Sequence, residues 1–429
     1  MKKLFIFLLA ILCILPAWAE TEIAGYIDEN IGLYHVEDTR TPVRLKNRGF
    51  EIALLSTVES SQNLSVSNSF FTGMDLLQKT AVIDFRDLDK GLQAELGVNL
   101  TIAAININWK DKWGFGFDLG NITAYANIDI PKKLLQFQQT KKEYFGVGGA
   151  AYFDIGLPIF FHILKLKMKL RPAAYIPIAY AEPNISYTFT EKGNGLYMGL
   201  AYDLYVYSVL DMENILGSDS FDFMALLGLL NTTTIGFDFN IGFEFPVIPQ
   251  LDVGVNILNI PVKPSQIKHY MRLTGEAYVD TSKIDIMEMM NGGEMPDDIY
   301  SFPDNFDIVY GTSEKSVIRP IKFIVHTNYR PFKHPMLTLI PNVGMSLNSM
   351  YAEPVSLEAG LKLRLDFANM FVTTFGINYE DRVWKNTMLL TLNLRIFQID
   401  VGIGIGSQDF KKSFRIAGAS ANIGFKFGW

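Results

Sequence analysis

The chain has 429 residues, of which 49% are hydrophobic and 13% aromatic, and it carries a formal net charge of −7. This acidic balance, without any basic patch interleaved with aromatic residues, argues against nucleic acid as a partner. The only cysteine is Cys13, in a segment that we expect to be removed, so a disulfide-stabilised secreted scaffold is excluded. No Pro/Ser/Gly-rich linker or charge block divides the chain, which favours one large unit.

Residues 1–19 have the order of a secretory signal peptide. Two lysines precede an apolar run over residues 4–15, and Ala17 and Ala19 form a small-x-small cleavage site. The segment is too short and too early for a spanning helix. Leu12 stands before Cys13 where a lipoprotein needs a small residue, which disfavours lipidation. We expect an exported mature chain that begins after Ala19.

The next segment, residues 20–90, is less regular than the rest. The second half of 65–79 has helical spacing, and Asn68 or Ser69 is a suitable N-cap. Two interpretations stay open: a plug folded into a barrel mouth, or a periplasmic or rim helix with one or two early strands. The predicted domains are therefore the signal peptide 1–19, a partly helical N-terminal plug or rim segment 20–90, and a transmembrane barrel 91–429.

From about residue 91 the sequence alternates with a period of two, which places successive side chains on opposite faces of a strand. In residues 234–245, isoleucine or phenylalanine fills every odd position, and Thr, Gly, Asp, Asn and Glu fill the even ones. Residues 355–367 repeat the pattern, and four of their six even positions are charged. After residue 19 no apolar run reaches the roughly eighteen residues of a membrane-spanning helix. If the mature chain spans a membrane, strands must do so.

Similar runs predict the remaining strands. They lie near 93–109, 112–128, 144–160, 164–170, 196–209, 250–260, 269–280, 318–330, 336–349, 370–381, 385–396, 399–405 and 413–429. A change of phase at Ala103 and Ala104 predicts a bulge. The fold class is all-β, an antiparallel transmembrane β-barrel of about 14 strands, with roughly 12–16 allowed because closed bacterial barrels have an even number. Interfacial girdles are predicted at Trp113, Tyr125, Tyr152, Tyr175, Tyr202, Tyr329, Tyr379 and Trp429.

The C-terminal strand separates a membrane barrel from a secreted β-sandwich, which also alternates polar and apolar residues. Its apolar face consists of Ala421, Ile423, Phe425, Phe427 and the terminal Trp429. This pattern resembles the signal by which the barrel assembly machinery recognises outer-membrane barrels. A sandwich has no reason to end on a bare aromatic strand, so the sequence favours the membrane barrel.

Two long interruptions, residues 211–231 and 281–316, are predicted as outer loops. The second combines Met287, Met289, Met290 and Met295 with several acids. Its methionines form either an adaptable apolar contact surface or the packing face of a short amphipathic helix on the rim, and the second interpretation is favoured. The acidic spacing matches no calcium loop, so no metal site is predicted.

The predicted inward face carries many charges. The lumen-lining candidates are Lys165, Lys167, Lys169, Arg171, Asp238, Glu244, Lys322, His326, Glu358, Lys362, Arg364 and Asp366. A basic wall would concentrate anionic solutes. Alternatively the cations pair with acids such as Asp118, Asp238 and Glu244 and brace the barrel. Because acids and bases are similarly numerous, the pairing interpretation is favoured.

The sequence shows no catalytic motif. None of the five histidines lies in a recognisable catalytic sequence, and there is no Gly-x-Ser-x-Gly, phosphate loop or Cys/His metal spacing. His326 shares a face with Lys322, Asn328 and Arg330, where a solvated or hydrogen-bonded histidine is favoured over a base. We expect no enzyme activity and no cofactor.

Chain length, strand number, the N-terminal segment and the closing aromatic strand together resemble the FadL-like long-chain fatty acid transporters. The stretches SNSFFTGMDLLQKTAVIDFRDL and WKDKWGFGFDLG resemble an uncharacterised group of spirochaete-type outer-membrane proteins. The resemblance implies a location in the bacterial outer membrane, in contact with its lipid, and passive transport of a small hydrophobic or amphipathic solute. The alternative is a structural or adhesive surface protein whose lumen is closed by salt bridges.

Overall fold

The computed structural model describes residues 50–65, 92–109, 113–135, 138–163, 166–193, 195–209, 235–283, 300–301, 307–332, 336–347, 355–367, 371–380, 383–394, 397–407, 410–414 and 418–428. The expected signal peptide, the helix expected within 65–79, the methionine-rich stretch, Lys165 and Trp429 lie outside these residues. Within them the chain is almost entirely antiparallel β-sheet. None of the described helices is long and apolar enough to cross a membrane.

The first half of the sheet contains long strands. They are β1 (Phe50–Ser65), β2 (Leu92–Trp109), β3 (Trp113–Ile130), β4 (Thr140–Gly156), β5 (Ile159–Ile163), β6 (Leu166–Lys192), β7 (Gly195–Ser208), β8 (Gly236–Ile248), β9 (Leu251–Lys263) and β10 (Ser265–Asp280). The short helix α2 (Lys132–Leu135) lies between β3 and β4, and the 3-10 turn η4 (Thr281–Lys283) follows β10.

The second half contains shorter strands. They are β11 (Tyr300–Ser301), β12 (Asp307–Val317), β13 (Ile321–Tyr329), β14 (Leu337–Leu347), β15 (Val355–Phe367), β16 (Phe371–Glu380), β17 (Val383–Asn393), β18 (Phe397–Ser407) and β19 (Gly418–Gly428). The 3-10 turn η5 (Lys412–Phe414) precedes β19. Most of these strands fall where the sequence predicts alternation.

The pairings of most strands follow a circuit, which we call the wall. From β1 it passes through β2, β3, the pair β4 and β5, then β6, β8 and β9. It continues from β9 to β13 and then strand by strand to β19. β19 pairs back with β1. The circuit leaves no free edge among its described strands, which satisfies the backbone groups of a structure placed in lipid.

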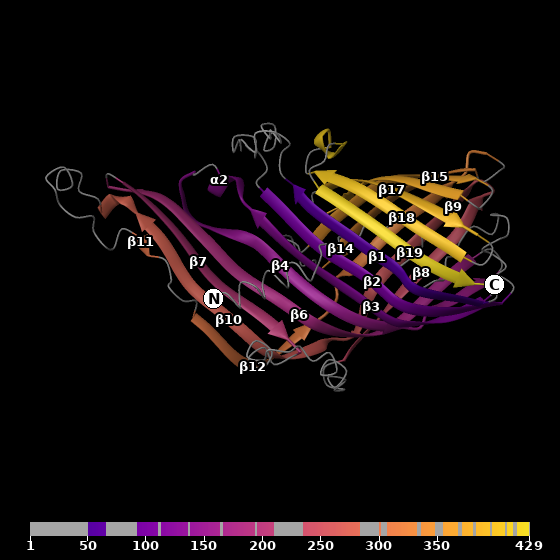
Figure 1. Ribbon diagram of the computed structural model, residues 1–429, viewed down its shortest axis with the longest axis horizontal. Helices are drawn as coiled ribbons and strands as arrows, with labels where there is room; N and C mark the ends of the chain where they lie inside the picture. The colour runs from indigo at the N-terminus through magenta and orange to yellow at the C-terminus, as the bar shows by residue number, and fades with distance from the viewer. Residues whose placement is uncertain are drawn as a thin grey trace.

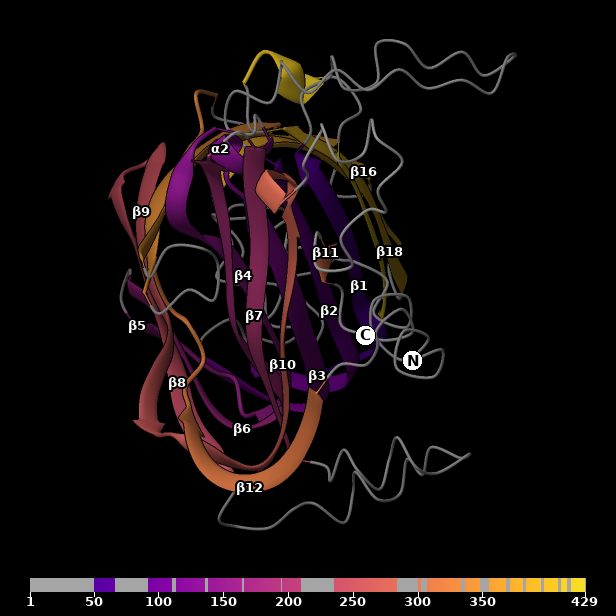
Figure 2. The same ribbon diagram turned by 90° about the vertical axis from the view of Figure 1, so that its left-hand side faces the viewer.

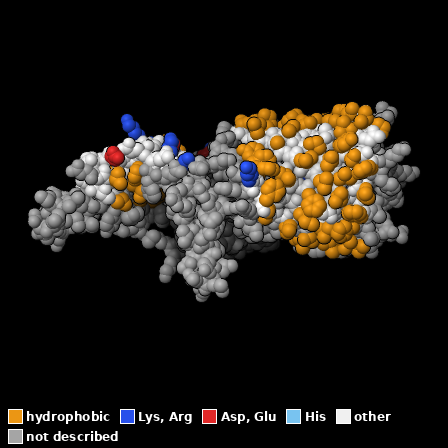
Figure 3. Space-filling model, turned by 90° about the horizontal axis from the view of Figure 1, so that it is seen from above, with side chains coloured by type: hydrophobic (Ala, Val, Ile, Leu, Met, Phe, Trp, Pro, Cys, Tyr) orange, Lys and Arg blue, Asp and Glu red, His pale blue; other side chains and the backbone are white. Residues whose placement is uncertain are grey.

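The wall is inverted relative to a water-soluble sheet. In β15, Leu357 and Leu361 are 65% and 50% exposed, whereas Lys362 on the other face is 1% exposed. In β8, Phe237 is 43% exposed and Asp238 only 3%. Figure 3 shows hydrophobic side chains gathered over the end of the molecule where Figure 1 places β14–β19. Apolar side chains outside and polar ones inside are the arrangement of a transmembrane barrel, so the predicted alternation of faces is confirmed.

A second part of the sheet, which we call the arm, branches from β6. One edge of β6 pairs with β8 over residues 167–175 and with β7 over residues 179–192. β7 then pairs with β10, and β10 pairs with β11 and β12. Figure 1 shows β7, β10 and β12 extending away from β14–β19, and Figure 2 shows β7, β10 and β12 from their own side. Because β12 pairs only with β10 among the described strands, the sheet as a whole is not closed, which corrects the expectation of one closed barrel.

The number of strands also differs from a simple reading of the sequence. The described residues contain nineteen strands rather than about 14. β4 and β5 share one position in the wall, and β7, β10, β11 and β12 belong to the arm. The nineteen strands therefore cannot be compared directly with the expected 14 of a single barrel, and that expected number stays a prediction. β12 lies within 307–317, where a loop was expected. That prediction was wrong because β12 lacks strict alternation and owes its conformation to pairing with β10.

Two further predictions concern local detail. The bulge expected at Ala103 and Ala104 stays a prediction, because the nearby register shift between β1 and β2 places the extra residue in β1, between Leu54 and Thr57. The girdle prediction is wrong for Tyr152 and Tyr175, which are each 1% exposed and pack together inside the sheet. Their aromatic rings are buried because they face inward where the arm leaves the wall.

Candidate functional site

The wall is interrupted between β4 and β5. β4 ends at Gly156, Leu157 and Pro158 follow, and β5 begins at Ile159. Pro158 has no backbone N–H to donate to a neighbouring strand. The interruption keeps some backbone hydrogen bonds: Leu157 N donates to Pro172 O at 3.0 Å, and Gly116 N donates to Pro158 O at 2.7 Å. The local sequence therefore opens the regular pairing without unfolding the wall.

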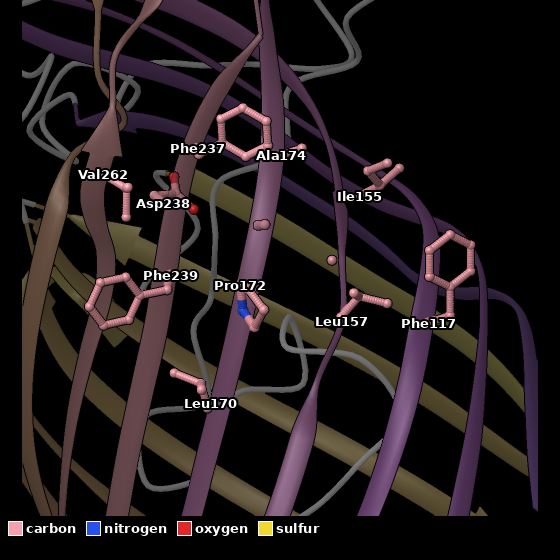
Figure 4. Close-up of a pocket in the computed structure, with 12 residues that line it drawn as sticks. Phe117, Ile155, Leu157, Leu170, Pro172, Ala174, Phe237, Asp238, Phe239 and Val262 are labelled. Atoms are coloured by element: carbon pink, nitrogen blue, oxygen red, sulfur yellow. The ribbon is translucent and has the colours of Figure 1, made fainter.

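An apolar pocket of about 660 Å³ lies over this interruption. Figure 4 shows its lining side chains coming from strands that are far apart in the sequence. The pocket is lined by Phe117, Ile155, Gly156, Leu157, Leu170, Pro172, Ala173, Ala174, Phe237, Asp238, Phe239 and Val262. Leu157 is 48% exposed and Val262 67%, so the pocket opens on the outer, apolar face. We call it the wall pocket.

Behind the wall pocket lies a buried network of charges. Arg171 on β6 donates through Nε to Asp118 Oδ2 at 2.6 Å and through Nη2 to Asp154 Oδ1 at 2.5 Å. All three side chains are at most 5% exposed. Asn121 Nδ2 donates to Asp154 Oδ1 at 3.1 Å. The carboxylates and the guanidinium compensate each other's loss of hydration, which a single buried charge could not do.

Arg319 extends this network to β8. It lies between β12 and β13, and its Nε and Nη2 donate to the two oxygens of Asp238 at 2.7 and 2.6 Å. Its Nη1 donates to Asp154 Oδ2 at 2.6 Å. Asp154 thus bridges two arginines, and the bidentate contact with Asp238 is the strong, orienting kind of ion pair. We call Asp118, Arg171, Asp154, Arg319 and Asp238 the charge network.

The wall pocket and the charge network share the same piece of backbone. Asp238 lines the pocket and accepts the contacts of Arg319. A Cβ atom on Gly156 would lie 2.4 Å from Arg171 Cζ, so only glycine lets the guanidinium lie against the strand here. One layer of sheet therefore separates an apolar pocket outside from fully buried charges inside.

A second inward cluster lies further along β6 and β8. Lys167 Nζ donates to Glu244 Oε1 at 2.6 Å, and Asn328 Nδ2 donates to Glu244 Oε2 at 3.1 Å. His326 Nε2 stands 3.7 Å from Glu244 Oε2. Arg330 Nη1 donates to Asp252 Oδ2 at 2.8 Å. Of the residues predicted to share this inward face, His326, Asn328 and Arg330 are buried and Lys322 is half-buried.

The other candidate residues lie on the inner face of the wall. Arg364 Nη2 stands 3.5 Å from Asp366 Oδ2, and Ser346 Oγ donates to Glu358 Oε1 at 2.9 Å. Lys169 and Lys362 are each 1% exposed, and Lys322 is half-buried. In β19, Ala421, Ile423, Phe425 and Phe427 pair with β18, and Ile423 is 40% exposed. Their roles as lumen lining and as assembly signal stay predictions.

The structure adds residues that sequence reasoning missed. Arg319 and Asp154 were not among the candidates, although together they hold most of the charge network. Asp154 lies in an alternating run and could have been found by counting inward positions. Arg319 lies at the start of the predicted run 318–330, at an odd position that the alternation assigns to the face opposite His326 and Arg330. Its partners, Asp154 and Asp238, are 165 and 81 residues away in sequence.

The site can bind an apolar molecule in the wall pocket and oppose its passage through the charge network. Its acids and bases are engaged with one another, and no group of three His, Cys, Asp or Glu side chains within the described ranges is placed to hold a metal. An apolar molecule fits the outer pocket, while the charge network disfavours its direct passage through the wall because apolar contact would strip the charges of their partners.

Comparison with known proteins gives solved structures of outer-membrane transporters. The toluene transporter TbuX of Ralstonia pickettii is 9% identical, with 91% of this chain and 92% of that chain covered and a TM-score of 0.43. The toluene transporter TodX of Pseudomonas putida is 7% identical, with 90% of each chain covered and a TM-score of 0.42. The monoaromatic hydrocarbon channel CymD is 8% identical, with 91% of each chain covered and a TM-score of 0.43.

These similar structures belong to the FadL-like group that the sequence resembles. At these TM-scores the likeness carries no argument about the solute of this chain. No protein-family model matches the chain, and no curated protein does.

Proposed function

We propose that this chain is an outer-membrane protein that passes a small hydrophobic or amphipathic solute passively, and that the wall pocket is where the solute meets the wall. The observation that carries the proposal is an apolar pocket set over an interrupted strand in a wall whose outer face is itself apolar. Pockets for small molecules are concave and mostly apolar. No energy source is needed, because the solute moves down its own gradient.

The charge network gives the pocket an inner boundary. Arg171 lies against Gly156, and Arg319 holds Asp238, so these two side chains cover the inside of the pocket. A solute that crosses here has to displace a guanidinium from its carboxylates, which is costly. Transport through this point therefore depends on movement of Arg171 or Arg319, and the network limits leakage of water and ions.

The test is uptake of a fluorescent hydrophobic probe by proteoliposomes that contain the full chain. Leu157→Trp enlarges an exposed lining side chain and reduces the space in the wall pocket. Leu357→Trp, on the exposed face of β15 and outside the pocket lining, is the matched control. We expect Leu157→Trp to slow uptake several-fold while Leu357→Trp leaves it unchanged. Equal uptake by both variants and by empty liposomes would contradict the proposal.

Mass spectrometry of small molecules that co-purify with the protein adds an independent measurement. A bound apolar molecule that Leu157→Trp displaces supports the proposal. A protein that carries no such molecule and conducts no ions in a planar bilayer supports the structural or adhesive alternative. Deletions that probe the N-terminal segment should end at residue 49, because β1 joins β19 to β2.

A further inference from the structure

One row of inward residues runs directly across six strands of the wall. Glu244 on β8 is opposite Gly254 on β9, and Gly254 is opposite His326 on β13. His326 is opposite Asn342 on β14, which is opposite Gly360 on β15. Gly360 is opposite Asn378 on β16. Directly opposed residues of antiparallel strands share a face, so all of these positions face inward at one level.

Within this row, Gly254 and Gly360 each lie between two large polar residues. A Cβ atom on Gly254 would lie 2.2 Å from His326 Cε1. A Cβ atom on Gly360 would lie 2.1 Å from Asn378 Oδ1 and 2.5 Å from Asn342 Oδ1. The two amide oxygens therefore converge from both sides over the bare backbone of Gly360. We call this place, with His326 beside it, the glycine notch.

The polar atoms of the glycine notch have no hydrogen-bond partner in the part of the chain that the structure describes. These atoms are Asn342 Oδ1, Asn378 Oδ1 and His326 Nδ1, whereas His326 Nε2 stands 3.7 Å from Glu244 Oε2. His326 is 1% exposed and Asn378 9%. Buried polar groups in proteins almost always have a partner, and leaving one without a partner is costly. Three such atoms on neighbouring positions of one row point to a bound molecule.

The atoms define the chemistry of that molecule. Two amide oxygens accept hydrogen bonds, and the remaining ring nitrogen of the imidazole donates or accepts one. The charges around the notch are mixed and select no ion, because Lys385 lies opposite Asn378 while Lys362 and Glu358 each lie two residues from Gly360 on the same face. An anion is disfavoured because the converging oxygens repel it. A neutral molecule with several hydroxyl groups satisfies all of these atoms, since each hydroxyl both donates and accepts.

We propose that the glycine notch, formed by His326, Asn342, Gly360 and Asn378, binds a neutral polyhydroxyl compound such as a sugar or polyol inside the wall. This site is separate from the wall pocket and does not rest on the proposed transport of a hydrophobic solute. The protein would then bind a polar solute inside the wall, in addition to the apolar solute proposed for the wall pocket.

The test is calorimetric titration of the full chain in detergent micelles with D-glucose, and separately with methylammonium chloride and sodium phosphate. Gly360→Ala places a methyl group where the two oxygens converge. Asn378→Leu and Asn342→Leu each keep the number and branching of the side-chain heavy atoms but remove one amide group with its oxygen. Ser356→Ala removes a buried polar group from the same face of β15 and is the control. Circular dichroism and the heat-dependent gel shift of folded barrels verify that each variant is folded.

We expect glucose to bind the unaltered chain and Ser356→Ala equally, and to bind Gly360→Ala and the two leucine variants about tenfold or more weakly, since buried partners are lost. If Gly360→Ala fails to fold, the leucine variants decide the result. The proposal is overturned if glucose does not bind, if it binds all variants equally, or if methylammonium or phosphate binds in its place.

Discussion

In β15 of the wall, Leu357 is 65% exposed, whereas in β10 of the arm Met271 and Leu273 are 2% and 5% exposed. Met271 and Leu273 pack with Leu204, Val206, Ile308 and Tyr310 from neighbouring strands. In the wall, no other described part of the protein covers apolar side chains such as Leu357, which is typical of a surface that lies against lipid. The arm buries part of its apolar face within the protein, as a sheet does in water. The same antiparallel strand pairing thus builds one surface suited to lipid and another suited to water.

The inner faces of the two regions differ as well. In the wall, ion pairs such as Lys167 with Glu244 have side chains only 6% and 3% exposed. In the arm, Arg272 and Asp203 form a bidentate pair with both oxygens at 2.8 Å, yet their side chains are 40% and 35% exposed. Buried pairs depend on each partner for compensation, whereas exposed pairs are compensated by water and contribute little. Losing one partner therefore matters far more in the wall.

In the arm, contacts between tyrosine rings join neighbouring strands, as buried ion pairs do in the wall. On the arm, Tyr205 and Tyr207 are parallel with centroids 6.0 Å apart, and Tyr270 lies 5.9 Å from Tyr205. Lys315 Nζ lies 5.7 Å from the centroid of Tyr207 and also pairs with Glu182. Aromatic and cation–π contacts stiffen an exposed sheet at small cost in desolvation.

The largest expected effect is at the junction of the two regions. Arg319→Leu removes the partner of Asp238 and one partner of Asp154, leaving buried carboxylates uncompensated. We expect the free energy of unfolding to fall by about 3–5 kcal/mol. Urea unfolding of the refolded protein measures it. The control is Lys133→Gln, whose partner is Glu143 and whose side chain is 52% exposed, with an expected loss of about 0–1 kcal/mol. Equal losses in both variants would contradict the distinction between buried and exposed pairs.

The next effect separates the arm from the wall. Met271→Ala leaves a cavity in the apolar cluster of the arm and should destabilise that region by about 2–5 kcal/mol. Limited proteolysis should then cleave the arm faster, with the wall fragment left intact. Val309→Ala, at a position 51% exposed on the same arm, should leave the cleavage rate unchanged. Simultaneous loss of the wall would show that the two regions unfold as one.

A third prediction tests which surface lipid covers. Leu357→Arg places a charge on the exposed face of β15 and should destabilise the folded protein in a bilayer by about 2–4 kcal/mol. Leu196→Arg on β7 of the arm, at a position 44% exposed, should cost much less. Folding titrations into lipid vesicles measure both. A larger loss for Leu196→Arg would place lipid around the arm and reverse the comparison.

The smallest effect concerns the tyrosine face of the arm. Lys315→Gln removes a cation that lies over Tyr180 and Tyr207, and we expect a loss of about 0.5–1 kcal/mol. Proteolysis rates of the arm should rise slightly, and added salt should abolish most of the difference from the unaltered chain. A salt-independent loss larger than that of Met271→Ala would show that this ion pair, rather than the apolar cluster, holds the arm.

The candidate site shows where sequence reasoning stops. Arg171 and Asp238 were identified from alternation, because their strands obey a period of two. Their partners Asp154 and Arg319 were missed. Arg319 reaches the site because it lies where the chain passes from β12, which pairs with β10 in the arm, to β13, which pairs with β9 in the wall. Contacts that span so much sequence are set by register and branching, which no local pattern contains.

The sequence by itself determined the class of structure, because alternation is a property of each strand alone and fixes which side chains share a face. It therefore predicted the inverted faces of β8 and β15 and most strand positions. Only the tertiary structure decided that β6 divides between β8 and β7, that β12 pairs with β10 alone among the described strands, and that Gly360 lies between Asn342 and Asn378. The first two outcomes depend on which strands pair, and the third depends on register, which a one-residue shift would change.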